Sequence, residues 1–392
     1  MIILSIETSC DDTAIAIIEA KGGFKKPSFK VLSSLTHSQI ELHAKWQGVV
    51  PSLAKREHSI NLTPLLETSL QKAGLLKETK SKAPIPEELK TILEREPELL
   101  ENLEILLPKI KTPKIDAIAV TYGPGLEPAL WVGVSLAKAL SICWKKPIIP
   151  VNHMEGHALS SLLESKSKVK SYKVIKFPAI ALLVSGGHTE LVLMKDWLKY
   201  KIIGSTRDDA SGEAFDKVAR IIGLTYPGGP QISKLAESFD PKNGTGIKFP
   251  RPMINSDDFD FSFSGLKTAV LYKAKELGQL TEELKKEIAY EFEQAVVDTL
   301  VSKTKKALIK FKAKSLILGG GVSANKKLRI STTEIVQKYF PETELLIPEI
   351  SLSADNAGMI GVAGYFRSIK KKPVFSLSAI KKIKAEGNLL LK

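Results

Sequence analysis

The chain has 392 residues, of which 43% are hydrophobic and 26% charged, and its formal net charge at pH 7 is +14. These values are typical of a soluble globular protein of about two domains. No apolar run is long enough to span a bilayer, and the sequence opens on an expected strand in place of a signal peptide. The chain has two cysteines, Cys10 and Cys143. We therefore expect a cytoplasmic protein without disulfides or membrane contact.

The positive charge gathers in lysine clusters at 166–176, 303–314 and 370–372, and in the tail from Lys381. A basic surface attracts polyanions, so nucleic acid is a candidate partner. A surface that is rich in lysine for solubility has the same composition. The charge alone therefore favours neither interpretation.

The first half opens with two apolar strands, 2–6 and 14–18, joined by the polar turn 7–13. Three acids and three hydroxyl residues crowd this turn, which is typical of a site that handles phosphate, metal or a proton. A third strand is expected at 31–35. Residues 51–73 are expected to form a helical stretch that Pro64 either kinks or divides into two helices. Residues 75–112, approximately, form an acid-rich, partly helical insertion.

Strands and helices then alternate, which predicts parallel strands with crossover helices. The expected order is a strand, a helix, a strand and a helix, over residues 115–121, 128–143, 147–151 and 152–163.

The second half repeats this plan. Three strands are expected at 179–184, 190–194 and 200–204, and a helix at 212–223. A helical insertion over about 224–312 contains a strong helix that starts at an N-cap, Thr281. A strand follows at 315–318 and a helix from 324. Another strand is expected at 345–350, and the last helix at 354–366.

Both halves therefore share one order of elements: three strands, helix, strand, helix, strand, helix. This order predicts an α/β protein with duplicated RNase-H-like halves, as in the actin, Hsp70 and sugar-kinase superfamily, which holds a nucleotide in the cleft between halves. We expect domains at 1–165 and 166–392, with a basic C-terminal tail and with the last helix able to pack back on the first half.

His153 and His157 are four residues apart, so on a helix both imidazoles lie on one face, where they can bind a divalent metal. A pair of partly exposed histidines near a helix start is the plainer alternative. A zincin protease needs a Glu directly after the first His, but Met154 stands there, and Glu155 is turned about another 100° away. A metalloprotease is therefore disfavoured.

Asp355 begins the last helix of the second half. If the halves are related by a twofold, this helix start faces the histidine helix across the cleft, which makes Asp355 the expected third ligand. An Asp in the first turn of a helix is also stabilised by the helix dipole without any metal.

Two glycine-rich turns are candidate anion or nucleotide sites: 185–189, where glycines let backbone N–H groups approach an anion, and 319–321 before a helix start. Glycine turns of both kinds are also common without a ligand. Asp216 can accept hydrogen bonds from ribose hydroxyls. There is no Walker A lysine motif.

With these motifs the chain resembles the bacterial tRNA N6-adenosine threonylcarbamoyltransferase family, once labelled sialoglycoprotein endopeptidase. The resemblance covers nearly the whole chain. It is carried by motifs in a fixed order: Glu-Thr-Ser-Cys-Asp at 7–11, Gly-Pro-Gly-Leu at 123–126, His-Met-Glu-Gly-His at 153–157, Val-Ser-Gly-Gly-His-Thr at 184–189, Gly-Glu-Ala-Phe-Asp-Lys at 212–217, Tyr-Pro-Gly-Gly-Pro at 226–230, Phe-Ser-Phe-Ser-Gly-Leu-Lys-Thr at 261–268 and Gly-Gly-Gly-Val-Ser-Ala-Asn at 319–325.

The resemblance implies a transfer of the threonylcarbamoyl group from threonylcarbamoyl-AMP to N6 of the adenosine next to the anticodon in tRNAs that read ANN codons, with release of AMP. It implies one divalent metal, iron(II) or zinc, on His153, His157 and Asp355. The donor would lie on Leu183, Val184, Ser185, Gly186, Gly187, Asp216, Gly229 and Asn325. Asp11 and Asp12 are the candidate catalytic acids; Asp11 would orient or deprotonate the N6 amine.

The resemblance also implies two protein partners, an inactive paralogue and a small P-loop ATPase. The chain departs from the family at Asp12, where many members have Glu, in the segment 43–52, and in the insertion 75–112. An ATPase or kinase of the same superfamily is the main alternative function. An inactive scaffold is disfavoured, because the histidines, Asp355 and the acidic turn are all present.

Overall fold

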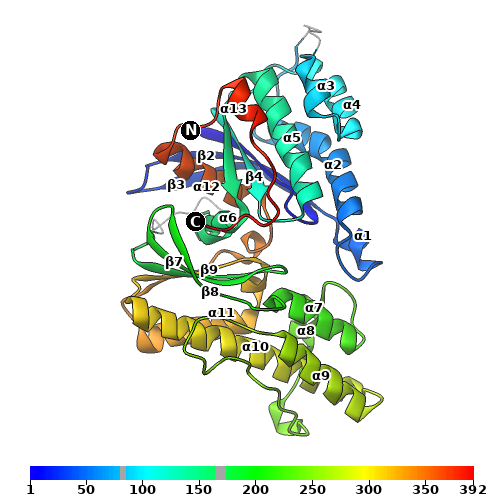
Figure 1. Cartoon of the computed structure of the whole chain (residues 1–392), viewed down its shortest axis with the longest axis vertical. Coiled ribbons are helices and arrows are strands. Elements are labelled where there is room, and N and C mark those ends of the chain that lie inside the picture. The colour runs from blue at the N-terminus through cyan, green and yellow to red at the C-terminus, as the bar shows by residue number, and fades with distance from the viewer. Residues whose placement is uncertain (80–84, 164–173) are drawn as a thin grey trace. The chain divides into compact units, whose positions relative to one another are not determined.

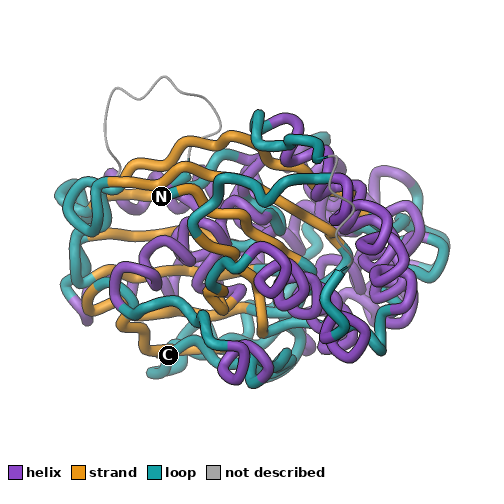
Figure 2. Tube along the Cα trace, turned by 90° about the horizontal axis from the view of Figure 1, so that it is seen from above, coloured by secondary structure: helices purple, strands orange, loops and turns teal. Residues whose placement is uncertain are grey.

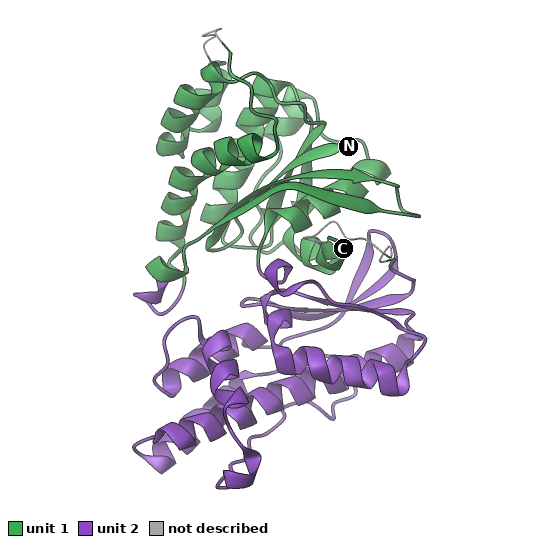
Figure 3. Cartoon of the chain, turned by 180° about the vertical axis from the view of Figure 1, so that it is seen from behind, with its two compact units in different colours: residues 1–42, 49–174, 355–391 green, residues 43–48, 175–354, 392 purple. Residues whose placement is uncertain are grey.

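A computed structural model of the chain describes residues 1–79, 85–163 and 174–392 (Figure 1). Most of the lysine cluster at 166–176 and part of the expected insertion at 75–112 lie outside these residues. The chain folds into two compact units (Figure 3). Unit 1 comprises residues 1–42, 49–174 and 355–391, and unit 2 comprises residues 43–48, 175–354 and 392.

Unit 1 contains a five-stranded sheet in the order β3-β2-β1-β4-β5. β1 pairs antiparallel with β2 and β2 with β3, whereas β4 and β5 join in parallel. The strands are β1 (Ile2–Glu7), β2 (Asp12–Lys21), β3 (Ser28–Ser38), β4 (Ala117–Gly123) and β5 (Ile148–Asn152).

Unit 2 repeats the pattern, with the order β10-β9-β6-β7-β8. β6, β7 and β8 are antiparallel, and β9 and β10 are parallel additions beside β6. The strands are β6 (Ala179–Val184), β7 (Thr189–Asp196), β8 (Lys199–Ser205), β9 (Ser315–Gly319) and β10 (Glu344–Leu346). Figure 2 shows the strands and helices of the described residues. The matching strand orders of the two sheets, with helices between strands along the chain, confirm the expected duplicated α/β fold.

In the first half, helix α2 runs without interruption through Pro64. The partly helical insertion contains two helices, because Pro97 begins the second and Glu96, the residue before it, leaves the helical conformation. The helices are α1 (Ile40–Ala44), α2 (Pro51–Lys72), α3 (Glu88–Ile92), α4 (Pro97–Leu106), α5 (Glu127–Trp144) and α6 (His153–Leu159).

The sheet of unit 1 has two different faces because side chains alternate along each strand. One face presents large apolar residues, such as Leu4, Ile6 and Ile17, to the core that it shares with α2 and α5. The other face presents small residues, such as Ser5, Ala16 and Ala119, and the late helix α12 (Ala357–Lys370) packs there. Figure 1 shows α12 and the α2–α5 layer on opposite sides of the sheet.

Close approach to this face depends on glycines of α12. A Cβ at Gly364 would lie 2.8 Å from Cβ of Ala119, and one at Gly361 would lie 3.1 Å from Oγ of Ser5. Residues 355–391, which include α13 (Leu377–Lys381), therefore belong to unit 1 although they follow the strands of unit 2 in the sequence.

The long segment between β8 and β9 holds two helices for which no bounds were expected, α8 (Gly228–Glu237) and α9 (Ser264–Leu277). The other long helices of unit 2 are α7 (Ser211–Ile221), α10 (Glu282–Phe311) and α11 (Lys326–Tyr339), the last of which follows β9 in the chain. The Thr281 hydroxyl caps α10 by accepting a hydrogen bond from the Leu284 backbone N–H, as expected. None of the helices in the described residues has the length and apolarity needed to cross a membrane.

Candidate functional site

Helix α6 positions the two histidines. The side chain of Asn152 caps this helix by accepting hydrogen bonds from the backbone N–H groups of Met154 and Glu155, at 2.9 and 3.3 Å. His153 and His157 are one turn apart, so their rings point the same way, with centroids 4.6 Å apart. Both side chains are buried.

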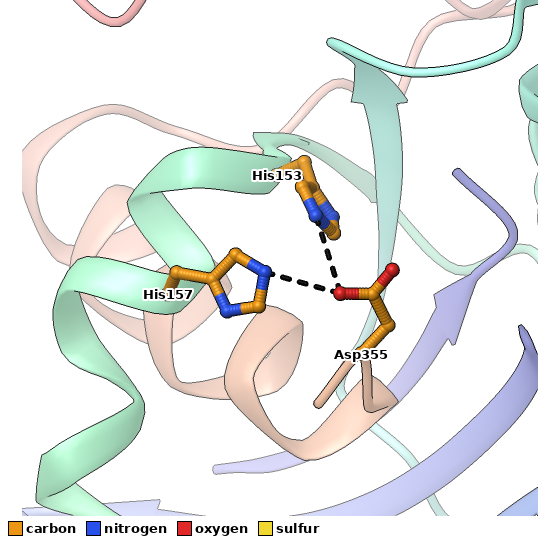
Figure 4. Close-up of side chains that lie close together, drawn as sticks. All are labelled: His153, His157 and Asp355. Carbon is orange, nitrogen blue, oxygen red and sulfur yellow. Dashed lines mark ion pairs between the residues drawn. The ribbon is translucent and has the colours of Figure 1, made fainter. Parts of the chain in front are cut away.

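Asp355 meets both histidines, as Figure 4 shows. Its Oδ1 lies 3.1 Å from Nε2 of His157 and 3.4 Å from Nε2 of His153. The carboxylate stands just before α12, whose N-cap is Asn356. One ligand atom from each of the three residues falls within 4.8 Å of the others, and all three belong to unit 1. The sequence-predicted trio is thus brought together.

The donor atoms of this cluster fit a divalent metal. Among the described residues, neither ring nitrogen of His157 has a hydrogen-bond partner of acceptable geometry, although both are buried. Burial also lowers the pKa of His157, which keeps the ring neutral and its lone pair available. Two imidazoles and one carboxylate are a donor set that zinc and iron(II) share.

Glu7 supports His153 from the opposite side. Its Oε2 lies 3.0 Å from Nδ1 of His153 and accepts a 2.6 Å hydrogen bond from the Thr121 hydroxyl. Burial opposes ionisation, yet the adjacent imidazole lowers the pKa of Glu7. A carboxylate at Nδ1 favours a proton on that nitrogen and leaves Nε2 as the ligand atom. In the sequence Glu7 is one acid of a crowded turn, and nothing there signals this role.

Asp11 and Asp12 lie in the same turn as Glu7, at the junction of β1 and β2. His58 of α2 holds this turn: its Nδ1 lies 2.7 Å from the Thr13 hydroxyl and its Nε2 lies 3.0 Å from the Cys10 carbonyl oxygen. Oδ1 of Asp12 is buried without a hydrogen-bond partner among the described residues. Burial, more than any neighbouring charge, raises the pKa of Asp12 to about 7.

Glu155, between the two histidines, forms an ion pair instead of facing the cluster. Its Oε2 accepts hydrogen bonds from Nε and Nη2 of Arg367, which lies on α12. The Glu155 side chain is fully buried. This pair joins the helix that carries the histidines to the helix that follows Asp355.

Unit 2 holds the predicted anion-binding residues. Leu183 and Val184 end β6, and the turn Ser185-Gly186-Gly187 follows, closed by a 2.8 Å hydrogen bond from the Ser185 N–H to the His188 carbonyl oxygen. The N-terminus of α7 contacts this turn, because the Gly212 N–H donates to the Ser185 carbonyl oxygen at 3.2 Å. Gly320 has φ +87°, and a Cβ there would clash with the Val184 carbonyl oxygen. The turn, a helix N-terminus and the glycine turn after β9 therefore meet, and backbone N–H groups in such positions can bind an anion.

The predicted nucleoside residues lie on the helices around this turn. Oδ1 of Asp216 accepts a 2.7 Å hydrogen bond from the Gly228 N–H, which places it at the start of α8, beside Gly229. Asn325 caps α11 and donates through Nδ2 to Glu293 and to Ser233. Neither of these partners was predicted from the sequence, because an acid in the middle of a long helix and a serine on another helix have no local motif.

Comparison with known proteins identifies relatives over almost the whole chain. The sequence profile described as tRNA N6-adenosine threonylcarbamoyltransferase matches residues 30–81 and 98–362. A protein of that name from Endomicrobium trichonymphae is 42% identical over 370 residues, which are 94% of this chain and 93% of the relative. Another from Thermosipho melanesiensis is 43% identical over 365 residues, 93% of this chain and 94% of the relative.

A solved structure shares the fold. Full-length HypF, in its phosphate- and nucleotide-bound form, matches 96% of this chain and 56% of its own, with a TM-score of 0.51 and 12% sequence identity. At this identity the likeness concerns the architecture alone.

Proposed function

The chain belongs to the tRNA N6-adenosine threonylcarbamoyltransferase family, and from this membership and the two sites we propose how it performs its reaction. The enzyme transfers a threonylcarbamoyl group to N6 of an adenosine in tRNA. We assign the donor to unit 2, the metal to unit 1, and the acceptor to the adenosine 3′ of the anticodon in tRNAs that read ANN codons.

The proposed donor is threonylcarbamoyl-AMP. The turn 185–187 at the N-terminus of α7 supports this choice, since exposed glycine N–H groups and the positive end of a helix suit a phosphate. Leu183 and Val184 end the strand that carries the turn. Asp216, Gly229 and Asn325 would hold the nucleoside.

His153, His157 and Asp355 would hold one divalent ion, which we take to be iron(II), with zinc as the alternative. When bound, the ion supplies positive charge that stabilises the phosphate as it leaves the mixed anhydride. Glu7 holds His153 with Nε2 toward the cluster, and the Glu155–Arg367 pair fixes the two helices that carry the ligands. The buried nitrogens of His157, which make no hydrogen bond of acceptable geometry among the described residues, support this assignment.

In the proposed reaction, N6 of the adenosine forms a bond with the carbamoyl carbon, the bond from that carbon to the phosphate oxygen breaks, and AMP leaves. The amine loses one proton. We assign Asp11 to orienting or deprotonating the amine and Asp12 to a supporting role beside it. Because the donor is already activated, positioning of the amine contributes more than the strength of the base.

The family resemblance further supports action in the cytoplasm with an inactive paralogue and a small P-loop ATPase. We therefore expect transfer to occur when the chain, the donor, the tRNA and both partners are combined.

The observation that carries the proposal is the His153, His157 and Asp355 cluster in a chain with these relatives. To test it, an unmodified ANN-decoding tRNA transcript is incubated with the chain, threonylcarbamoyl-AMP and the candidate partners, and its nucleosides are analysed by mass spectrometry. The control transcript carries guanosine in place of the target adenosine. Threonylcarbamoyl-adenosine in the first transcript only is the expected result; hydrolysis of ATP without the modified nucleoside would favour an ATPase instead.

A further inference from the structure

The side-chain amide of Asn325 is engaged within the protein. Its Nδ2 donates to Oε1 of Glu293 at 2.6 Å and to the Ser233 hydroxyl at 2.9 Å, and its Oδ1 accepts from the Leu328 N–H at 2.8 Å. An asparagine NH₂ has two hydrogens to donate. Both therefore have partners, and the amide nitrogen has no donor left for a ligand.

Glu293 is the centre of this arrangement. Its side chain is 5% exposed, and its Oε1 accepts a second hydrogen bond, 2.7 Å long, from the Ser233 hydroxyl. We call Asn325, Glu293 and Ser233 the Asn325 junction. It joins α8, α10 and α11 at one point, and the donors around the Glu293 carboxylate offset part of the cost of burying it.

The Asn325 junction lies between segments of the proposed donor site. Asn325 follows the glycine turn whose Gly320 packs against Val184, the residue just before the proposed phosphate-binding turn 185–187. Ser233 is one helical turn after Gly229 on α8. A shift of the junction would therefore move the start of α11 and the first turn of α8 relative to each other.

We propose that Glu293 is a positioning residue of the adenylate site: it fixes the Asn325 amide, so that Asn325 meets the nucleoside through its main chain and not through its NH₂ group. This inference rests on the proposed donor. It predicts that the chain binds the nucleotide with normal affinity as long as the hydrogen bonds of the Asn325 junction are intact. Which residue of the junction donates the hydrogens should not matter.

An exchange of donor and acceptor tests the inference. Asn325→Asp places a carboxylate against that of Glu293, and like charges at this distance repel. Adding Glu293→Gln restores a donor–acceptor pair, because the new amide can donate to the new carboxylate, which still caps α11. AMP is the probe, its dissociation constant is measured by calorimetry, and each variant's unfolding temperature is measured without nucleotide. Glu334→Gln, at an exposed position of α11, is the control.

We expect Asn325→Asp to weaken AMP binding about 10-fold or more, and the double variant to return to within about 3-fold of wild type. A double variant that folds like wild type but binds AMP as weakly as Asn325→Asp would overturn the inference, since the NH₂ group would then contact the nucleoside directly. If the wild-type chain binds no AMP at all, the proposed donor is contradicted as well.

A second variant serves if Asn325→Asp does not fold. Ser233→Ala removes both hydrogen bonds that the Ser233 hydroxyl makes in the Asn325 junction, one to Glu293 and one from Asn325, without changing any charge. We expect it to weaken AMP binding about 3- to 10-fold. Unchanged affinity in this variant would contradict a positioning role for the junction.

Discussion

Oδ1 of Asp355 lies 3.1 Å from Nε2 of His157, although the two residues come from opposite halves of the sequence. The contact exists because α12 returns to the sheet of unit 1 and packs on its small-residue face. The three residues of the proposed metal site thus all belong to unit 1.

The return of α12 gives the first prediction. Gly364→Ala would place a Cβ 2.8 Å from that of Ala119 and push the helix away from the sheet. Overpacking of this kind costs about 1–3 kcal/mol of unfolding free energy. We expect urea denaturation to show this loss and zinc binding to weaken with it. Gly265→Ala is the matched control, because the nearest atom to a Cβ there is 4.0 Å away. Equal stability of the two variants would contradict close packing of α12.

Glu7 gives the second prediction. Glu7→Gln keeps the size of the side chain but removes the charge that holds the Nδ1 proton of His153. Partners behind metal-binding histidines typically contribute about 10- to 100-fold in metal affinity, and we expect a loss in that range. Competition with a chromogenic chelator measures it. Glu41→Gln, on the exposed side of α1, should bind zinc like wild type, and the same affinity for Glu7→Gln would argue against its role.

The parts of the fold and of the candidate site that could be predicted are those that a short, contiguous stretch of sequence specifies. The histidine pair, the acidic turn and the glycine turns are each contiguous motifs, and the order of strands and helices revealed the duplication. Asp355 was predicted as the third ligand from a twofold relation between halves, but its position follows from glycines on α12 that match small residues on β1 and β4. Such matching between distant segments has no periodicity that a single sequence displays.

The supporting residues were less predictable for the same reason. Arg367 and Glu293 are ordinary charged residues on helices, where a solvated position is the default expectation. Their partners, Glu155 and Asn325, are separated from them in the chain and meet them only in the folded units. The effect of proline on the helices also could not be predicted from the sequence. Helix α2 continues through Pro64, whereas Pro97 starts a new helix.

The Glu155–Arg367 pair gives the third prediction. Arg367→Met leaves a fully buried carboxylate without its partner, and breaking a buried pair typically costs about 3–5 kcal/mol. We expect about 3 kcal/mol, the low end, because the Arg367 side chain is 32% exposed. The double variant Glu155→Gln with Arg367→Met removes the charge and should recover much of this loss. Guanidinium denaturation of metal-free protein measures both, and an equal loss in the two variants would contradict an electrostatic origin.

Asp12 gives a prediction for pH. Its pKa is raised from an ordinary value of 3.8 to about 7, chiefly by burial and then by the charge of Asp355. Between these two values the folded state holds more protons than the unfolded state, so this group makes the free energy of unfolding fall as the pH rises from about 4 to 7. Asp12→Asn should remove this dependence.

The measurement for Asp12 is the difference in unfolding free energy between wild type and Asp12→Asn, taken from about pH 4 to 8 in metal-free protein. We expect the variant to gain stability relative to wild type across this range and the gain to level off above about pH 7. A difference that is constant with pH would show that Asp12 titrates near its ordinary value.

The most direct test of the account joins metal content and transfer in one experiment. Wild type, His157→Ala, Asp355→Ala and the exposed control Glu41→Gln are purified in parallel, their iron and zinc are counted by mass spectrometry, and each is assayed for threonylcarbamoyl-adenosine on an ANN-decoding transcript. We predict one metal ion per chain and modified nucleoside for wild type and the control, and the loss of both for the two ligand variants. Full modification by Asp355→Ala in the absence of bound metal would contradict the metal site.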